Sequence, residues 1–516
     1  MHESPPVQST PRLTVCMVVR NDGPAVSQTL QSIAAMADEI VVVDTGSSDG
    51  THAIVGSFSA RLIEFPWCDD FSAARNHALA KATGDWVLWL DAGETLSPED
   101  ATALKNSVAS GQLSDSTAYV MIVKPPVAPT VIAAEQIARI RLMPRRDGLR
   151  FQGRVRESIF DTLDNLGMEV DGLPYRILRG PREHEETLKR KRAQRNLRLA
   201  DLEIADRGRT PQLINCLADA AQTLGDTKRA IDLYSETLKT EESASLERLE
   251  AYYGVLTSLD NTPNGRGSRL SLGVRALEEV PRDAQLLCGI GGYLQADGRL
   301  DLAIRSYQTA YSYGHVNPLV WHLDEITTIA ATCLSVALQS TGEEDAALDV
   351  LQKAVERDGH LPRLHRALLE IHIKHGRKDA ALQQLEYFAD EENAEQLALA
   401  VEGACLASQR NWASAHDLLQ RAYADGCRDE VCYRWLTVTL LANDQLDAVQ
   451  QLLADWRNQY PASAEPQQIQ AALSSSADET GESSHRIDAR VDSPSGPAMA
   501  SRSSQQSHQQ QGRTRG

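Results

Sequence analysis

Short strand-like runs alternate with helical segments in the amino-terminal part of the chain. Four such runs lie at residues 13–19, 40–43, 61–65 and 86–90, and each ends in acidic or turn-forming residues. A run that is apolar at successive positions indicates a strand buried on both faces, as in a parallel sheet. Apolar residues recur at helical spacing between the runs. The alternation therefore predicts an α/β domain with a doubly wound, mostly parallel sheet.

The pattern changes between about residues 210 and 461, where helical spacing continues with an internal repeat. A turn residue is followed five positions later by an alanine, and Ala347, Ala381, Ala415 and Ala448 are 34, 34 and 33 residues apart. This is the period of tetratricopeptide repeats, in which each helix pair buries its apolar face by stacking on the next pair. The repeats predict an α-solenoid with a concave surface. Residues 261–268, rich in Pro, Asn and Gly, predict a long loop within it.

These patterns divide the chain into five segments. We expect a disordered amino terminus at residues 1–10, an α/β domain at residues 11–184 and a connecting helix at residues 185–209. The helical repeats then cover residues 210–461. Residues 474–516 are rich in Ser, Gln, Arg and Gly and predict a disordered tail, because this composition buries too little apolar area to fold.

The composition limits the partners and the location of the protein. The net charge of −19 at pH 7 argues against a general binder of nucleic acids or anionic membranes. The eight cysteines include no Cys-x-x-Cys pair, which favours a reducing compartment. The sequence also has no run of about 18 apolar residues and no apolar core of signal-peptide length. We therefore predict a cytoplasmic protein without a transmembrane segment.

The candidate chemistry begins where the second run ends. Residues 40–43 lead into Asp44, and a turn-forming stretch that contains Asp49 follows. This edge of an open α/β sheet binds ligands, and an Asp here can accept hydrogen bonds from a base or a ribose. Glycine and serine let the backbone approach closely. The pattern predicts a nucleotide site, although the same residues would also serve as a strand, a turn and a helix cap.

Four motifs, at residues 43–51, 65–71, 74–76 and 89–94, follow one another in this part of the chain. In this order they resemble the nucleotide-sugar-binding half of family 2 glycosyltransferases, which have the GT-A fold. The resemblance is to the bacterial branch with carboxyl-terminal tetratricopeptide repeats, and it covers about residues 11–205. It implies transfer of a sugar from a nucleotide-sugar donor to an acceptor hydroxyl, with inversion at the anomeric carbon.

The resemblance also implies roles for individual residues. Asp44 would contact the nucleotide base, with Asp49 in the same turn. Arg75, followed by Asn76, would lie near the donor diphosphate. Asp91 would be the first acid of the family's Asp-x-Asp motif, near the ribose and the metal.

Three metal-associated positions depart from the family pattern. The second acid of the motif is replaced by Gly93, which has no side-chain ligand, and Glu94 follows it. Arg156 stands where the family usually has a histidine, and Arg179 lies in the region of a second one. Asp91 is the metal-ligand candidate, and Glu94, which we place among the nucleotide-sugar-binding residues, is a substitute for the missing acid, although one residue later on an extended segment its side chain points to the other side. A Mn²⁺ or Mg²⁺ cofactor and a metal-independent site both remain open.

Two interpretations of these departures compete. A guanidinium forms two charge-assisted hydrogen bonds with a phosphate and stays protonated. Arg156, with Arg75 and Arg179, would then replace or assist the metal in stabilising the leaving diphosphate. The alternative is that the metal site and most of the activity have been lost, which would leave a catalytically degenerate scaffold.

The reaction needs a base that takes the proton of the acceptor hydroxyl. Glu157 is our first candidate, because it lies beside Arg156 in an acceptor-side segment of the family, residues 151–159. A simple ion pair with a neighbouring arginine is the alternative role for Glu157, and Glu94 is the second candidate base.

The concave surface of the repeats predicts a protein or peptide partner. Two roles are open for this surface. It would either present an acceptor to the transferase or hold the enzyme in an assembly.

Overall fold

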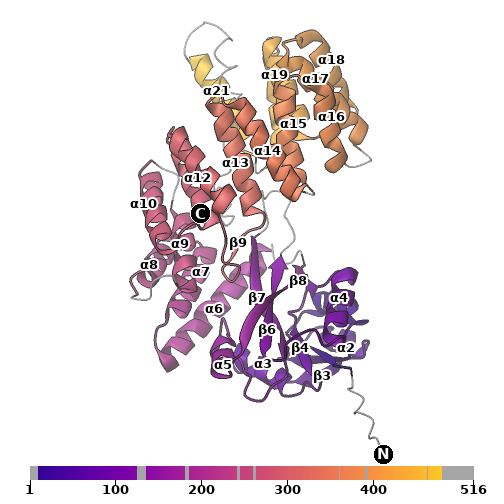
Figure 1. The fold of residues 1–516 in the computed structure, drawn as a ribbon, viewed down its shortest axis with the longest axis vertical. Helices are drawn as coiled ribbons and strands as arrows, with labels where there is room; N and C mark the ends of the chain where they lie inside the picture. Colours follow the sequence, from indigo (N-terminus) through magenta and orange to yellow (C-terminus); the bar gives the residue numbers. More distant parts are fainter. Residues whose placement is uncertain are drawn as a thin grey trace, which may run out of the picture.

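The computed structural model describes residues 10–124, 135–180, 185–240, 245–259, 263–359, 361–389, 393–461 and 463–478. A mixed sheet with helices on both faces forms the amino-terminal domain, and a curved array of helices follows it (Figure 1). The predicted α/β domain followed by an α-solenoid is confirmed. The predicted disordered segments lie outside the described residues, except for residue 10 and for residues 474–478, which are helical.

The sheet has the strand order β3-β2-β1-β4-β7-β6-β8-β5, and β9 pairs with β7. The first four strands in chain order pair with one another in parallel, as the sequence predicts, while β7 pairs antiparallel with both β4 and β6. The strands are β1 (Leu13–Val19), β2 (Glu39–Asp44), β3 (Arg61–Glu64), β4 (Trp86–Trp89), β5 (Glu94–Thr95), β6 (Thr117–Lys124), β7 (Glu135–Pro144), β8 (Glu169–Arg179) and β9 (His322–Leu323).

Both faces of the parallel strands β1, β2 and β4 are buried, whereas the edge strand β3 is partly exposed. Val42 of β2 packs into a core with side chains of α1 and α4, whereas Val41 and Val43 pack into a second core with side chains of α3 and α5. The helices of this domain are α1 (Gly23–Ile33), α2 (Thr51–Gly56), α3 (Phe71–Leu79), α4 (Pro98–Ala109) and α5 (Phe160–Asn165). Burial on both sides explains why these strands are apolar at successive positions.

Small residues at the repeat period let the later helices pack closely. Ala303, Ala347, Ala381 and Ala415 are fully buried, and Ala448 is partly buried. The helices are α6 (Glu186–Arg207), α7 (Pro211–Leu224), α8 (Thr227–Thr237), α9 (Leu246–Ser258), α10 (Pro263–Glu279), α11 (Ala284–Ala296), α12 (Leu300–Tyr313), α13 (Ile326–Ser340), α14 (Glu344–Asp358), α15 (Pro362–Lys374), α16 (Lys378–Gln384), α17 (Ala394–Ser408), α18 (Trp412–Ala424), α19 (Glu430–Ala442), α20 (Leu446–Gln459) and α21 (Glu465–Asp478), with a 3₁₀ turn at Leu385–Tyr387.

One prediction for the repeats is wrong. The segment 261–268 was expected to be a long loop, but α10 begins at Pro263 and continues to Glu279. Proline is tolerated in the first turn of a helix, where its missing N–H would have no intrahelical partner. The composition of the segment therefore marks a helix start and not a break in the array.

The repeats are joined to the sheet away from their connecting helix. The segment between α12 and α13 contains β9, which pairs antiparallel with Glu135 and Gln136 of β7. The Ala138 amide of β7 donates a hydrogen bond to the Pro318 carbonyl at 2.6 Å, and Lys124 pairs with Asp324. A loop of the repeats thus extends the sheet of the amino-terminal domain (Figure 1).

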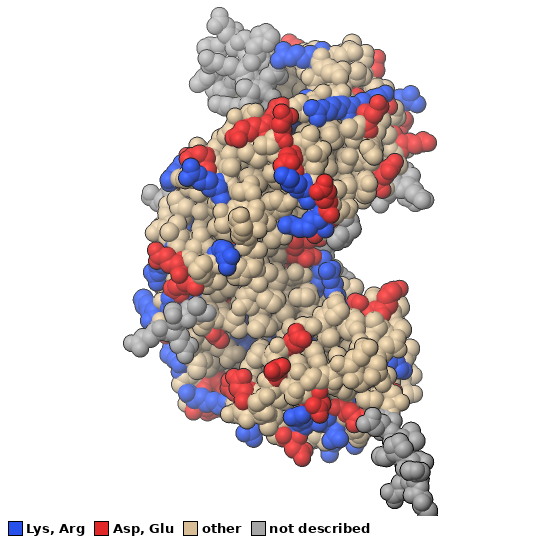
Figure 2. All heavy atoms as spheres, viewed as in Figure 1, with Lys and Arg blue, Asp and Glu red and all other residues tan. Residues whose placement is uncertain are grey.

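Charges of both signs are interspersed over the face of the molecule drawn in Figure 2, which is hollowed between the repeats and the amino-terminal domain. Within the described ranges, no helix combines the length and the hydrophobicity that crossing a bilayer requires. All eight cysteines are free thiols. The cytoplasmic location stays a prediction.

We expect Gly291→Ala to destabilise the repeats. A Cβ at Gly291 of α11 would lie 2.5 Å from the Tyr307 ring of α12, and overpacking of this kind costs about 1–3 kcal/mol. Gly267→Ala is the matched control, because Gly267 is exposed on α10 and has open space at this position. Urea unfolding followed by circular dichroism should show a lower midpoint for Gly291→Ala and an equal or higher one for Gly267→Ala. Equal midpoints for Gly291→Ala and the unmutated chain would contradict the tight packing.

Candidate active site

The carboxyl ends of the parallel strands bring the predicted acids to one edge of the sheet. Asp44 is the last residue of β2, and Asp91 follows β4 by two positions. Strand β1 lies between them, so the two strand ends are about 10 Å apart. Asp44 and Asp91 therefore lie at one edge of the sheet, and Arg75 contacts Asp91 there.

Asp44 is buried and holds its own turn together. Its Oδ2 accepts hydrogen bonds from the amides of Gly46 and Ser47 at 3.1 and 2.9 Å, and His52 Nε2 lies 2.9 Å from the same oxygen. Although burial acts in the opposite direction, these hydrogen bonds lower the pKa of Asp44. Asp49 is exposed and accepts a hydrogen bond from the Thr51 amide at the start of α2.

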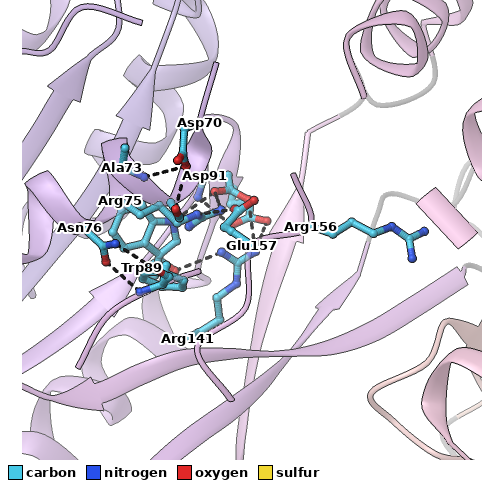
Figure 3. Close-up of polar contacts among 12 residues, drawn as sticks. Asp70, Ala73, Arg75, Asn76, Trp89, Asp91, Arg141, Arg156 and Glu157 are labelled. Atoms are coloured by element: carbon cyan, nitrogen blue, oxygen red, sulfur yellow. Dashed lines mark hydrogen bonds and ion pairs between the residues drawn. The ribbon is translucent and has the colours of Figure 1, made fainter. Parts of the chain in front are cut away.

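Arg75 of α3 lies at the centre of the site. Its Nε donates to Glu157 Oε1 at 2.5 Å, and its Nη2 donates to Asp91 Oδ1 at 3.2 Å (Figure 3). The guanidinium stacks over the Trp89 ring, 4.4 Å from its centroid. The structure thus joins three residues that the sequence analysis named separately. It also gives Glu157 the ion pair that we considered as its alternative role.

Arg141 of β7 is a site residue that the sequence analysis missed. Its side chain is only 4% exposed, and its Nη2 donates to Glu94 Oε1 at 2.7 Å and to Asp91 Oδ2 at 3.4 Å. Arg179 of β8 also contacts Glu94, with 3.2 Å between Nε and Oε1. The available signal was the charge of Arg141 between Ile140 and Leu142, because a strand buries such a position only with a partner.

The arginines determine how Asp91 ionises, whereas burial is the largest effect on Glu94 and raises its pKa. Burial tends to raise the pKa of Asp91, but the charges of Arg141 and Arg75 outweigh it and hold the pKa far below its usual range. The Asp91 side chain still keeps 42% of its surface exposed, whereas Glu94 keeps 2%. Asp91 can therefore bind a ligand in its ionised form, whereas Glu94 is buried in contact with Arg141 and Arg179.

Arg156 lies outside this cluster. Its Nη1 donates to Glu250 Oε2 of α9 at 2.8 Å, and its Nη2 bonds to Asp219 of α7. Figure 3 shows its side chain extending away from Arg75, in the opposite direction to Glu157. The physical reason is the pairing of the Arg156 guanidinium with the carboxylates of Asp219 and Glu250, and the Arg156 backbone is left-handed, with a φ of 51°. The expectation that Arg156 faces the same pocket as Arg75 is therefore corrected.

Asn76 has a positioning role in the site. Its Nδ2 donates to the Phe151 carbonyl at 2.9 Å, and its Oδ1 accepts from the Phe151 amide at 2.8 Å. The side-chain amide of Asn76 thus binds the backbone of Phe151 through both its nitrogen and its oxygen, at the start of the segment that carries Glu157. The predicted contact of Asn76 with a nucleotide sugar stays a prediction.

Asp91 and Glu94 are the carboxylates that a divalent cation would use here, and one or two carboxylates together with substrate phosphates are the usual ligands of Mg²⁺. The residues that the structure describes contain no group of three or more His, Cys, Asp or Glu arranged to hold a metal. Gly93 offers no side-chain ligand, and its φ of 90° suits glycine. The carboxylates of Asp91 and Glu94 are already engaged by Arg75, Arg141 and Arg179. The positive charge at this edge of the sheet comes from guanidinium groups.

Comparison with known proteins agrees with the motifs. Residues 14–119 match the profile of the family described as Glycosyl transferase family 2. A TPR repeat-containing protein of Synechococcus elongatus is 31% identical over 251 residues, which are 47% of this chain and 60% of that protein. An uncharacterized glycosyltransferase of Rickettsia conorii is 29% identical over 110 residues, 21% of this chain and 39% of that protein. The chain thus covers less than two thirds of these relatives.

Two solved structures are also similar. A mannosyltransferase from Pyrobaculum calidifontis, solved with GDP-mannose and Mn²⁺, is 18% identical with a TM-score of 0.29, over 52% of this chain and 88% of that one. Yeast Tom70 is 14% identical with a TM-score of 0.33, over 58% of this chain and 60% of its own. From the family profile and the repeat period, the amino-terminal domain is similar to glycosyl transferase family 2 over residues 14–119, and helical repeats with the tetratricopeptide period follow it.

Proposed function

We propose that this chain transfers a sugar from a nucleotide-sugar donor to an acceptor hydroxyl, with inversion at the anomeric carbon. The observation that carries the proposal is the contact of Arg75 with both Asp91 and Glu157 at the ligand-binding edge of a family 2 domain. In this arrangement the Arg75 guanidinium lies between Asp91, the acid proposed to contact the donor, and Glu157, the acid proposed to contact the acceptor.

Arginine side chains bind the donor diphosphate in this proposal. Arg75 and Arg141, supported by Arg179, exchange part of their carboxylate contacts for phosphate oxygens. Guanidinium groups stabilise the charge that develops on the leaving diphosphate, and they do so best in a site that excludes water. Asp44 and Asp91 then contact the base and the ribose, as the family resemblance implies.

Glu157 is the general base in the proposed reaction. The acceptor oxygen attacks the anomeric carbon, the bond from that carbon to the diphosphate oxygen breaks, and the acceptor proton passes to the Glu157 carboxylate. A single displacement of this kind inverts the configuration. The nucleoside diphosphate leaves with the electron pair of the broken bond.

The competing proposal is a degenerate transferase that acts as a scaffold through its repeats. It is favoured by the ion pairs that already engage Arg75, Arg141 and Glu157. In both proposals the repeats dock a protein or peptide, either as the acceptor or as a partner in an assembly.

The first test is donor binding without a metal. We expect at least one uridine, guanosine or thymidine diphosphate sugar to raise the melting temperature in EDTA and in Mn²⁺ alike. A ligand at 100 times its Kd stabilises the folded state by about 2.7 kcal/mol. A shift that needs Mn²⁺ would contradict the arginine site, and the absence of any shift would favour the scaffold.

The second test is the removal of the central arginine. Arg75→Met should lower kcat/KM by about two to three orders of magnitude, since one lost donor at a developing charge costs roughly this much. Arg146→Met is the matched control, because Arg146 forms only an exposed ion pair with Asp115 in the same domain. Transfer assays on both variants, with melting curves to check folding, should separate them. Equal activities would remove Arg75 from the proposed site.

The third test asks whether Glu157 is the general base. Glu157→Gln should reduce turnover by about 10²–10⁴-fold, the usual contribution of a general base, while donor binding is retained. Asp161→Asn serves as the control, because Asp161 is an exposed acid four residues further along the chain. Full turnover in Glu157→Gln would exclude Glu157 as the base.

A further inference from the structure

The segment that carries Glu157 is attached to the repeats by the residues just before it. The Arg154 amide donates to Glu203 Oε2 of α6 at 2.7 Å, and the Arg154 guanidinium donates to Asp206 Oδ2 at 2.6 and 3.1 Å. Val155 is buried in an apolar cluster with Leu199 of α6 and with side chains of α7. Two successive residues of the amino-terminal domain are therefore packed against helices α6 and α7.

Arg156 continues this attachment into the first repeats. Its guanidinium bonds to Glu250 of α9 and to Asp219 of α7, and its carbonyl accepts a hydrogen bond from Gln212 Nε2 at 3.0 Å. Burial acts to lower the pKa of Arg156, but the charges of Glu250 and Asp219 raise it well above its ordinary value. The guanidinium is thus a permanent cation between two repeat helices.

The two carboxylates are themselves held in place. Asn215 Nδ2 donates to Glu250 Oε2 at 3.0 Å, and the Tyr234 hydroxyl donates to Asp219. Asn215 is fully buried, so its amide has little freedom to move. The acceptors that bind Arg156 therefore have fixed positions within the helix pairs.

The backbone links these contacts to the site. Arg156 adopts a left-handed conformation, with a φ of 51°, which a side chain of this size adopts only when its surroundings enforce it. With Arg156 fixed among the repeats, Glu157 turns to the other side and meets Arg75 at 2.5 Å. Gln152 and Ser158, which flank the loop of residues 153–157, exchange backbone hydrogen bonds of 2.8 and 2.9 Å.

We infer that Asp219 and Glu250 of the repeats are positioning residues for the transferase, which hold Arg156 and thereby place the Glu157 carboxylate beside Arg75. This inference rests on the proposed function for its effect on turnover. The first repeats are then a part of the catalytic unit and not only a docking surface.

The test compares two pairs of carboxylates in the full chain. Asp219→Asn with Glu250→Gln removes both charges that bind Arg156 and keeps the side-chain sizes. Glu370→Gln with Glu465→Gln is the matched control. These two acids, on α15 and α21, bind Arg434 of α19 at 2.6 Å each, far along the array from the candidate site. We expect the first double variant to lower kcat about tenfold or more with little change in the donor KM, because misplacement of a catalytic group by about 1 Å is costly.

A second measurement does not depend on turnover. Hydrogen exchange of the Gln152 and Ser158 amides should accelerate in Asp219→Asn with Glu250→Gln and stay unchanged in the control. Unchanged exchange in both double variants overturns the inference, as does an equal loss of kcat in both. If the unmutated chain transfers no sugar from any donor, the proposed function fails, and the exchange measurement alone decides whether the repeats hold the loop.

Discussion

The ion pairs of Arg75 connect the parts of the amino-terminal domain that the candidate site needs. Arg75 lies on α3, Asp91 follows β4, and Glu157 belongs to a loop beyond β7. Buried charges are stable only when they are paired and hydrogen-bonded, so this guanidinium fixes both acids relative to the sheet. The same requirement brings in Arg141, which pairs with Glu94 below Asp91. A ligand with phosphate groups would have to compete with these carboxylates for the same donors.

The repeats and the sheet share several contacts. Strand β9, in the loop between α12 and α13, pairs with the sheet of the amino-terminal domain. Arg156 of that domain in turn binds carboxylates of α7 and α9 in the repeats. These contacts lie at different positions along the solenoid, and Figure 1 shows the helices around one side of the sheet. Because each repeat of a solenoid contacts only its neighbours, the contacts of Arg156 involve only the first repeats.

The parts of the site that could be predicted were those set by local pattern. Asp44 and Asp91 follow apolar strands, and this order alone places both acids at one edge of the sheet. Arg141 was missed because its role depends on the antiparallel pairing of β7 with β4, which no short motif encodes. The loop expected at residues 261–268 was wrong because Pro263 is compatible with the first turn of a helix.

The sequence by itself determined the α/β domain, the repeat period and the acids at the strand ends, since these follow from spacings of a few residues or from a regular period. Only the tertiary structure decided which partner each arginine finds. Arg156 and Glu157 are adjacent, yet Arg156 contacts residues 63 and 94 positions further along the chain, while Glu157 contacts Arg75, 82 positions earlier. The different directions of these two side chains depend on one left-handed backbone angle and on charges that packing brings together. The local sequence specifies neither of them.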